Sequence, residues 1–267
     1  MNEQLKKTLR SLLWTLRGEK FERMVEMNAK LLSTALLHQK TFLPYKNYCK
    51  GEKDIVVCGA GPTLNQYEPI EGAIHIAVNR AFLYDKVNFD FIFAQDYDGI
   101  KMVEQDMVKY RPGECVKFLG TQIDEKKMIP ESLILKCGAL RFDTDGYIYR
   151  DGTKGKMIVD LESRPLCNMM NVGQSVMQLA LYMNPRRIYI VGCDMSGAHF
   201  ANGNESQAER EERDNRVRKT WEESREKLLH RWREIKNFAS IYYPDTEIIS
   251  VNPVGLKGMF KDLYQHE

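Results

Sequence analysis

The chain has 267 residues, of which 43% are hydrophobic and 28% charged. This composition excludes disordered and fibrous classes and allows one large α/β core with or without a small appendage. The net charge of +2 gives no bulk attraction to nucleic acid, so no nucleic-acid partner is expected. Six cysteines without paired metal-ligand spacing, and the lack of a membrane-span or signal-peptide pattern, predict a cytoplasmic protein with reduced thiols.

Residues 1–45 are predicted to form a helical segment, followed by a single domain over 46–267. Leucines recur in this segment at helical spacing: Leu5, Leu9, Leu12, Leu13 and Leu16. Two interpretations stay open for residues 1–40. The helix lies on the anionic inner face of the membrane with Trp14 as its interfacial anchor, or it packs on the domain or on a second subunit of a homo-oligomer.

The stretch from Asp54 to Leu64 reads as a buried strand that runs into a tight turn and the start of a helix. Gly59 and Gly61 permit positive φ or close backbone approach, and Pro62 suits the first helical position. Free N–H groups beyond it, at the positive end of the helix dipole, predict a phosphate site. The alternative is a tight turn without a ligand.

Five further apolar segments are separated by amphipathic or polar stretches. They lie at 74–78, 90–94, 116–120, 188–192 and 247–251. This alternation predicts an α/β fold, a modified Rossmann-like, mostly parallel and doubly wound sheet. Because ligands of such sheets bind at the carboxyl ends of the strands, polar residues at these ends predict one cleft. They are Asn79, Arg80, Gln95, Asp96 and Asp98.

Two segments interrupt the alternation. Residues 141–167 are expected to form a hairpin insertion, because turn residues flank Tyr147-Ile148-Tyr149. Residues 202–216 are almost entirely polar, which predicts a solvated helix end or a lid over about 197–216. Between them, Asn171 to Ser175 opens a helix that Asn184-Pro185 ends, and residues 252–258 are expected to lead into a short terminal helix.

Four motifs in this order resemble two related families. They are Val57-Cys58-Gly59-Ala60-Gly61-Pro62-Thr63-Leu64, Ala77-Val78-Asn79-Arg80-Ala81-Phe82, Asn171-Val172-Gly173 and Ile188-Tyr189-Ile190-Val191-Gly192-Cys193-Asp194. One family is the bacterial lipooligosaccharide sialyltransferases, which use CMP-sialic acid. The other joins the motility accessory factors, which glycosylate flagellin, to the archaeal hydroxymethylpterin pyrophosphokinases. The resemblance covers about residues 54–260.

The sialyltransferase resemblance implies a nucleotide held over the first turn, a lid that closes on the donor, and no required metal or other cofactor. By position, it implies that a set of residues binds the nucleotide or its phosphate. That set is Gly59, Ala60, Gly61, Pro62, Thr63, Asn79, Gln95, Asn171 and Gly173. Arg80, Asp96 and Ser175, which lie beside them in the sequence, are further candidates for binding the nucleotide or its phosphate. Three positions depart from the family pattern. Ala60 and Gln95 each replace an asparagine, and Ser196 replaces a tyrosine.

The pyrophosphokinase resemblance lies in the stretch from Phe89 to Gly99. It implies that Asp96 and Asp98 hold Mg²⁺ on a triphosphate. The alternative for these carboxylates is capping, with Asp98 at the start of a helix over 99–110.

The leading hypothesis is therefore a glycosyltransferase of lipopolysaccharide biosynthesis. It would move a sialic-acid-like sugar from a CMP-linked donor to a glycan, glycolipid or protein acceptor. His199 is the candidate base, because an imidazole titrates near neutral pH, and Asp194 is placed with it as a catalytic residue. The alternatives are a Mg²⁺-dependent pyrophosphokinase of the hydroxymethylpterin type and a non-catalytic scaffold of an envelope assembly.

Overall fold

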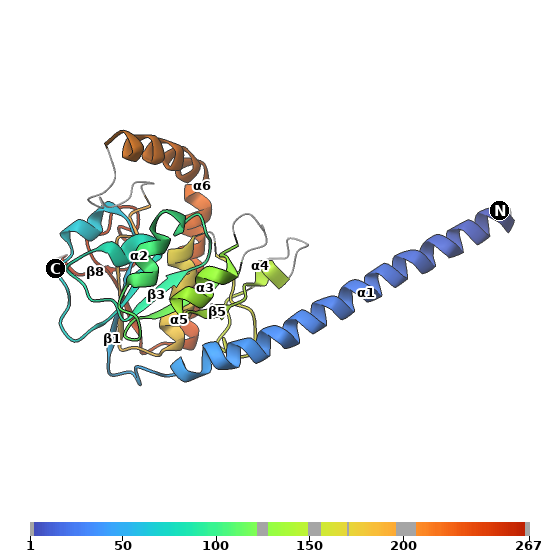
Figure 1. Cartoon of the computed structure of the whole chain (residues 1–267), viewed down its shortest axis with the longest axis horizontal. Coiled ribbons are helices and arrows are strands. Elements are labelled where there is room, and N and C mark those ends of the chain that lie inside the picture. Colours follow the sequence, from blue (N-terminus) through green and yellow to red (C-terminus); the bar gives the residue numbers. More distant parts are fainter. Residues whose placement is uncertain (1–2, 122–127, 149–155, 170, 196–206, 265–267) are drawn as a thin grey trace.

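The protein is built on one eight-stranded sheet whose neighbouring strands are all parallel (Figure 1). The computed structural model describes residues 3–121, 128–148, 156–169, 171–195 and 207–264. The strands are β1 (Asp54–Cys58), β2 (Ile74–Val78), β3 (Phe91–Ala94), β4 (Val116–Gly120), β5 (Leu140–Phe142), β6 (Arg187–Val191), β7 (Glu247–Ser250) and β8 (Lys261–Asp262). Their order is β5-β4-β3-β2-β1-β6-β7-β8. The expected α/β doubly wound architecture is confirmed.

Helices cover both faces of the sheet. The α-helices are α1 (Glu3–Thr41), α2 (Glu104–Lys109), α3 (Glu131–Cys137), α4 (Asp145–Ile148), α5 (Val172–Tyr182) and α6 (Gln207–Tyr242). Four short 3₁₀ helices join them: η1 (Leu43–Tyr45), η2 (Pro62–Gln66), η3 (Asn79–Leu83) and η4 (Lys101–Val103). The connections after β1 and β2 are therefore 3₁₀ helices, where amphipathic α-helices were expected.

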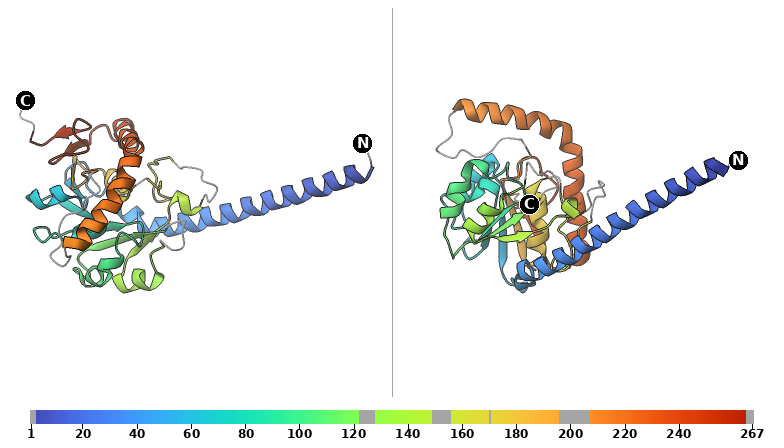
Figure 2. Two further views of the ribbon diagram at one scale, coloured as in Figure 1. Left: turned by 90° about the horizontal axis from the view of Figure 1, so that it is seen from above. Right: turned by 45° about the vertical axis from the view of Figure 1, so that its right-hand side comes forward.

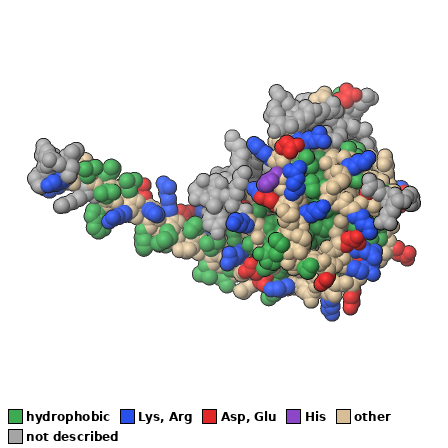
Figure 3. All heavy atoms as spheres, turned by 180° about the vertical axis from the view of Figure 1, so that it is seen from behind, with side chains coloured by type: hydrophobic (Ala, Val, Ile, Leu, Met, Phe, Trp, Pro, Cys, Tyr) green, Lys and Arg blue, Asp and Glu red, His purple; other side chains and the backbone are tan. Residues whose placement is uncertain are grey.

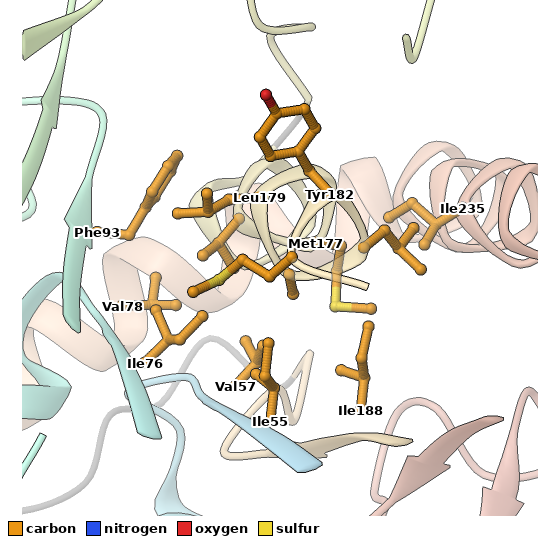
Figure 4. Packing of buried hydrophobic residues seen from close by; sticks show 14 of the residues in the cluster. Ile55, Val57, Ile76, Val78, Phe93, Met177, Leu179, Tyr182, Ile188 and Ile235 are labelled. Carbon is orange, nitrogen blue, oxygen red and sulfur yellow. The ribbon is translucent and has the colours of Figure 1, made fainter. Parts of the chain in front are cut away.

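The sheet separates two hydrophobic cores, because successive side chains of a strand point to opposite faces. Ile55 and Val57 of β1 face α5 and the C-terminal part of α6, a packing that Figure 4 shows together with Met177. Val56 and Cys58 face η2, η3, α2 and α3. Burial on both faces explains why the central strands are continuous apolar runs in the sequence.

Helix α1 projects from the domain, and only its C-terminal end is docked (Figures 1 and 2). Thr34, His38 and Thr41 are buried there, whereas Trp14 and Phe21 are exposed. The prediction of an N-terminal helix is confirmed, and the short helix η1 follows it. No helix within the described residues is both long and apolar enough to span a bilayer.

Two expectations differ from the structure. The described residues of segment 141–167 contain the end of β5 and the short helix α4 where a hairpin was expected, because Asp145 begins a helical turn at once. Residues 252–258 form turns that lead into β8, so the prediction of a short terminal helix was wrong for the described residues. Residues 207–216 of the expected lid are the start of α6, which agrees with the alternative of a helix end, and residues 197–206 lie outside the described part.

His38 fastens α1 to the domain through three backbone groups. Its Nε2 accepts a hydrogen bond from the N–H of Asp143 (2.8 Å), so Nδ1 carries the proton and donates to the carbonyl oxygens of Leu161 (2.9 Å) and Arg164 (2.7 Å). Burial lowers the pKa of His38, and the two carbonyl acceptors and the charge of Asp143 offset part of this effect. A proton added to Nε2 would face the Asp143 N–H, so this docking requires a neutral imidazole.

We expect the free energy of unfolding to fall as the pH drops below about 6.5, by up to about 1.4 kcal/mol per pH unit for His38. The unfolded chain takes up a proton there that the buried imidazole takes up only at lower pH. His38→Gln should flatten this slope in urea titrations at several pH values. His230→Gln is the control, since the His230 side chain is 67% exposed. An unchanged slope in His38→Gln would contradict the assignment.

Candidate functional site

The candidate site lies where the order of the sheet reverses. Strands β2 to β5 follow on one side of β1, and β6 to β8 follow on the other, so β1 and β6 are central neighbours. In open parallel sheets this switch point, outside the carboxyl ends of the strands, is where ligands bind. The residues after β1, β2, β3 and β6 therefore form the candidate site.

The turns after β1 and β6 are pressed against each other, backbone to backbone. The N–H of Gly59 donates to Val191 O (2.8 Å), and that of Gly61 donates to Gly192 O (2.7 Å). A Cβ on Gly59 would lie 2.4 Å from Gly192 O, and one on Gly192 would lie 2.2 Å from Gly59 O. Both positions require glycine for close approach, and Gly192 also has a φ of +66°.

Asp194 ties these two turns together. Its Oδ2 accepts a hydrogen bond from the N–H of Thr63 (2.8 Å), and its Oδ1 accepts one from the Thr63 hydroxyl. The hydroxyl oxygen of Thr63 in turn accepts the N–H of Gly192 (3.2 Å). Burial raises the pKa of Asp194, while the bonds from Thr63 lower it in part. A carboxylate of the protein thus occupies donors of the first turn.

This arrangement corrects the expectation of a phosphate held by free N–H groups of the first turn. The N–H groups of Gly59, Gly61, Thr63 and Leu64 all bond to acceptors within the protein. Pro62 begins η2, a five-residue 3₁₀ helix that has no long dipole to offer. The N–H groups of Thr63 and Leu64, which were expected to be free beyond Pro62, are therefore already bonded, and contacts of residues 59–63 to a nucleotide or its phosphate stay a prediction.

Asn79 follows β2 in a left-handed backbone conformation, with a φ of 51°. Its amide lies against the backbone of Gly99, where a Cβ would be 2.6 Å from Nδ2. Its Oδ1 is buried and has no hydrogen-bond partner among the described residues. Since buried polar atoms are nearly always satisfied, this oxygen is available for a donor that the described part of the chain does not provide.

Gln95 stands at the end of the neighbouring strand, β3. It is only 2% exposed, and its Nε2 donates to Oδ1 of Asn168. Its Oε1 is buried and, like that of Asn79, has no partner within the described residues. Two adjoining strand ends therefore each carry an unsatisfied amide oxygen. Asn168 was not predicted, because it lies in an irregular segment whose sequence carries no periodic signal.

The carboxylates after β3 have different surroundings. Oδ1 of Asp96 accepts the N–H of Gly99 (2.8 Å), so Asp96 caps this turn, whereas Asp98 is exposed. Capping was expected of Asp98, at a helix that in fact begins later, with η4. Within the described ranges, no three His, Cys, Asp or Glu side chains are grouped to hold a metal ion. Arg80, next to Asn79, is half-buried.

Asn171, Gly173 and Ser175 lie at the N-terminus of α5. Oδ1 of Asn171 accepts the N–H of Gln174 (2.8 Å), so Asn171 is the N-cap of the helix that was expected to open here. The Ser175 hydroxyl is buried and accepts the N–H of Met169 (3.2 Å). A Cβ on Gly173 would lie 3.4 Å from Cys193 Sγ, so this helix start abuts the turn after β6. His199 lies outside the described residues.

Comparison with solved structures finds sialyltransferases. The sialyltransferase CST-II in complex with trisaccharide acceptor and CMP is 11% identical with a TM-score of 0.41, over 74% of this chain and 80% of that one. CstII from Campylobacter jejuni in complex with cytidine-5'-monophosphate is 10% identical with a TM-score of 0.40, over 74% of this chain and 79% of that one. A tyrosine-to-phenylalanine variant of CST-II in complex with CMP is 11% identical with a TM-score of 0.42, over 80% of this chain and 86% of that one. The likeness concerns the fold alone. No protein-family model and no curated protein sequence matches the chain.

The contact between Gly59 and Gly192 predicts a large cost for one added methyl group. Gly192→Ala should lower the free energy of unfolding by at least about 2 kcal/mol more than Gly113→Ala does. Gly113 is the matched control, because it has a similar φ of +80° but open space at its Cβ position. Urea denaturation of both variants measures the difference. Equal losses would mean that only backbone conformation, and not the close approach, matters at Gly192.

Proposed function

We propose that this chain is a glycosyltransferase that moves a sialic-acid-like sugar from a CMP-linked donor to a glycan or protein acceptor. The donor would lie across the carboxyl ends of β1, β2 and β3. The four ordered motifs that resemble the lipooligosaccharide sialyltransferases all fall at the switch-point edge of the sheet or at the start of α5 beside it. Their convergence at one edge supports one nucleotide-sugar site.

One observation carries the proposal: the amide oxygens of Asn79 and Gln95, at adjacent strand ends, have no hydrogen-bond donor among the residues that the structure describes. A buried oxygen without a donor costs free energy, which a ligand that brings hydroxyl or amino groups would recover. A nucleotide sugar brings ribose and sugar hydroxyls and, in cytosine, an exocyclic amino group. An anion without a proton, such as sulfate, brings only acceptors, so it would not satisfy these two oxygens.

In the proposed reaction the bond between the anomeric carbon and the phosphate oxygen breaks, and an acceptor hydroxyl forms the new bond. Positive charge develops on the sugar and negative charge on the departing CMP, so prearranged donors near the phosphate lower the barrier. Arg80 is our candidate for this task, since it follows Asn79 at the start of η3. A base removes the proton of the acceptor hydroxyl, and we assign this role to His199.

Asp194 receives a different role in this proposal. Its two carboxylate oxygens accept bonds from Thr63, and only 5% of the residue is exposed. It is therefore a positioning residue that holds the turn after β1 against the turn after β6. We expect it to act on the reaction through the geometry of Thr63 and Gly61 and without touching the sugar.

CMP should stabilise the protein in the absence of added metal. At a concentration about 100 times its Kd, binding contributes about 2.7 kcal/mol to the free energy of unfolding, which a thermal-shift assay detects readily. Asn79→Gly should weaken CMP binding at least about 10-fold, because it removes the amide while glycine tolerates the positive φ. Unchanged affinity in this variant would remove Asn79 from the site.

The matched control is Asn184→Gly. Asn184 has the same φ of 51° but precedes β6, at the opposite edge of the sheet. It should leave CMP binding unaltered. If neither CMP nor CMP-sialic acid raises the unfolding temperature, and only ATP or GTP with Mg²⁺ does, the result would point instead to the pyrophosphokinase. Failure of every nucleotide to bind would point to a scaffold.

His199→Ala should reduce the release of CMP from CMP-sialic acid about 100-fold or more while leaving CMP affinity intact, because only the proton-transfer step loses its base. The wild-type rate should fall as the pH is lowered through the pKa of the base, and this dependence should disappear in the variant. His230→Ala, on an exposed position of α6, serves as the control. Near-normal turnover in His199→Ala would exclude His199 from the mechanism.

A further inference from the structure

Helix α1 carries a row of exposed apolar side chains on its outward side, which we call the outer stripe. Its members are at least half exposed: Trp14, Phe21, Val25, Leu32 and Leu36. Their intervals of seven and four residues keep them on one side of a helix. The side chains that dock α1 on the domain, at 34, 38 and 41, fall on the opposite side by the same spacing. The outer stripe therefore faces away from the domain.

We propose that the outer stripe is a dimerisation seam, which pairs in parallel with the outer stripe of a second copy of this chain. Four members of the stripe, at 14, 21, 25 and 32, together with positions 18, 28 and 35, follow the alternating four-and-three spacing of a coiled-coil seam, and Leu36 lies beside it. A single protomer rarely leaves so long an apolar row in water. Since the stripe faces away from the domain, the two domains would lie on the outer sides of the helix pair.

Two residues within the seam would be unfavourable in an isolated helix. Gly18 lies in the middle of α1, where glycine weakens a helix, and a Cβ there would meet nothing within 4 Å. In a pair, the space beside Gly18 accommodates an aromatic ring from the other helix, such as Trp14. Asn28 is exposed among apolar seam residues. A parallel pair places Asn28 opposite its own copy, where one amide donates and the other accepts.

The charges beside the seam suit a second copy better than a membrane. In a parallel pair, position 17 of one helix faces position 22 of the other, and these are the exposed, oppositely charged Arg17 and Glu22. A helix that lies on a membrane needs its apolar side chains on one side only. Here Leu12 and Leu16 are exposed on the side away from the stripe, and Figure 3 shows hydrophobic and basic side chains mixed along the arm.

Sedimentation velocity of the full chain over a range of concentrations tests the proposal. We expect a reversible dimer. Phe21→Glu with Leu32→Glu should raise its dissociation constant by about 100-fold or more, while the unfolding temperature of the domain stays the same. The control pair, Leu12→Glu with Leu16→Glu, carries the same charge change on the other side and should leave the dimer intact. A chain that stays monomeric at every concentration overturns the proposal.

Oxidative cross-linking tests the orientation. Asn28→Cys should give a disulfide-linked dimer, whereas Glu19→Cys, on another side of α1, should not. Cross-linking at 19 and not at 28 overturns the parallel seam. Flotation with vesicles of anionic phospholipid tests the alternative of a membrane contact. The proposal fails, and the stripe is a membrane contact, if three results are obtained together: the wild type floats with the vesicles, Phe21→Glu with Leu32→Glu abolishes flotation, and no dimer forms. Neither measurement involves a nucleotide, so each is independent of the proposed activity.

Discussion

The backbone contact between the turns after β1 and β6 is the constraint on which the rest of the site depends. Gly59 and Gly192 can approach so closely only without side chains, and this approach lets the carboxylate of Asp194 reach Thr63. The bond fixes the start of η2 against the turn after β6. A buried carboxylate that is held by a hydroxyl and an amide is costly, and its raised pKa reflects that cost.

Much of the fold could be predicted because central parallel strands are buried on both faces. The continuous apolar runs at 74–78 and 116–120 became β2 and β4 with the expected bounds. Strand β5 has three residues and β8 has two, which is too short for any hydrophobic period to register. The helix α4 was missed for a similar reason, since its four residues resemble the turn chemistry that flanks a hairpin.

The site was predictable only where topology alone decides position. Asn79 and Gln95 follow apolar runs, so parallel strands place them at one edge whatever the details of packing. The bond between Thr63 and Asp194 joins residues 131 positions apart, and no local pattern in the sequence identifies such a partner. The sequence therefore indicated an anion-binding turn, whereas the fold supplies its own anion. Asn168 was beyond prediction because only the folded chain brings it to Gln95.

Helix α1, the arm that projects from the domain, is docked at one end only, so a force on its free end acts on the sheet at the docking point. A helix of 39 residues is a rod of roughly 60 Å, and its buried end grips the domain through Asp143. That carboxylate accepts the hydroxyl of Thr34 from the arm and the hydroxyl of Thr121 from the chain just after β4. A sideways force on the far end of the rod would thus act as torque on the carboxyl ends of β4 and β5, next to the strand β3 that Gln95 follows.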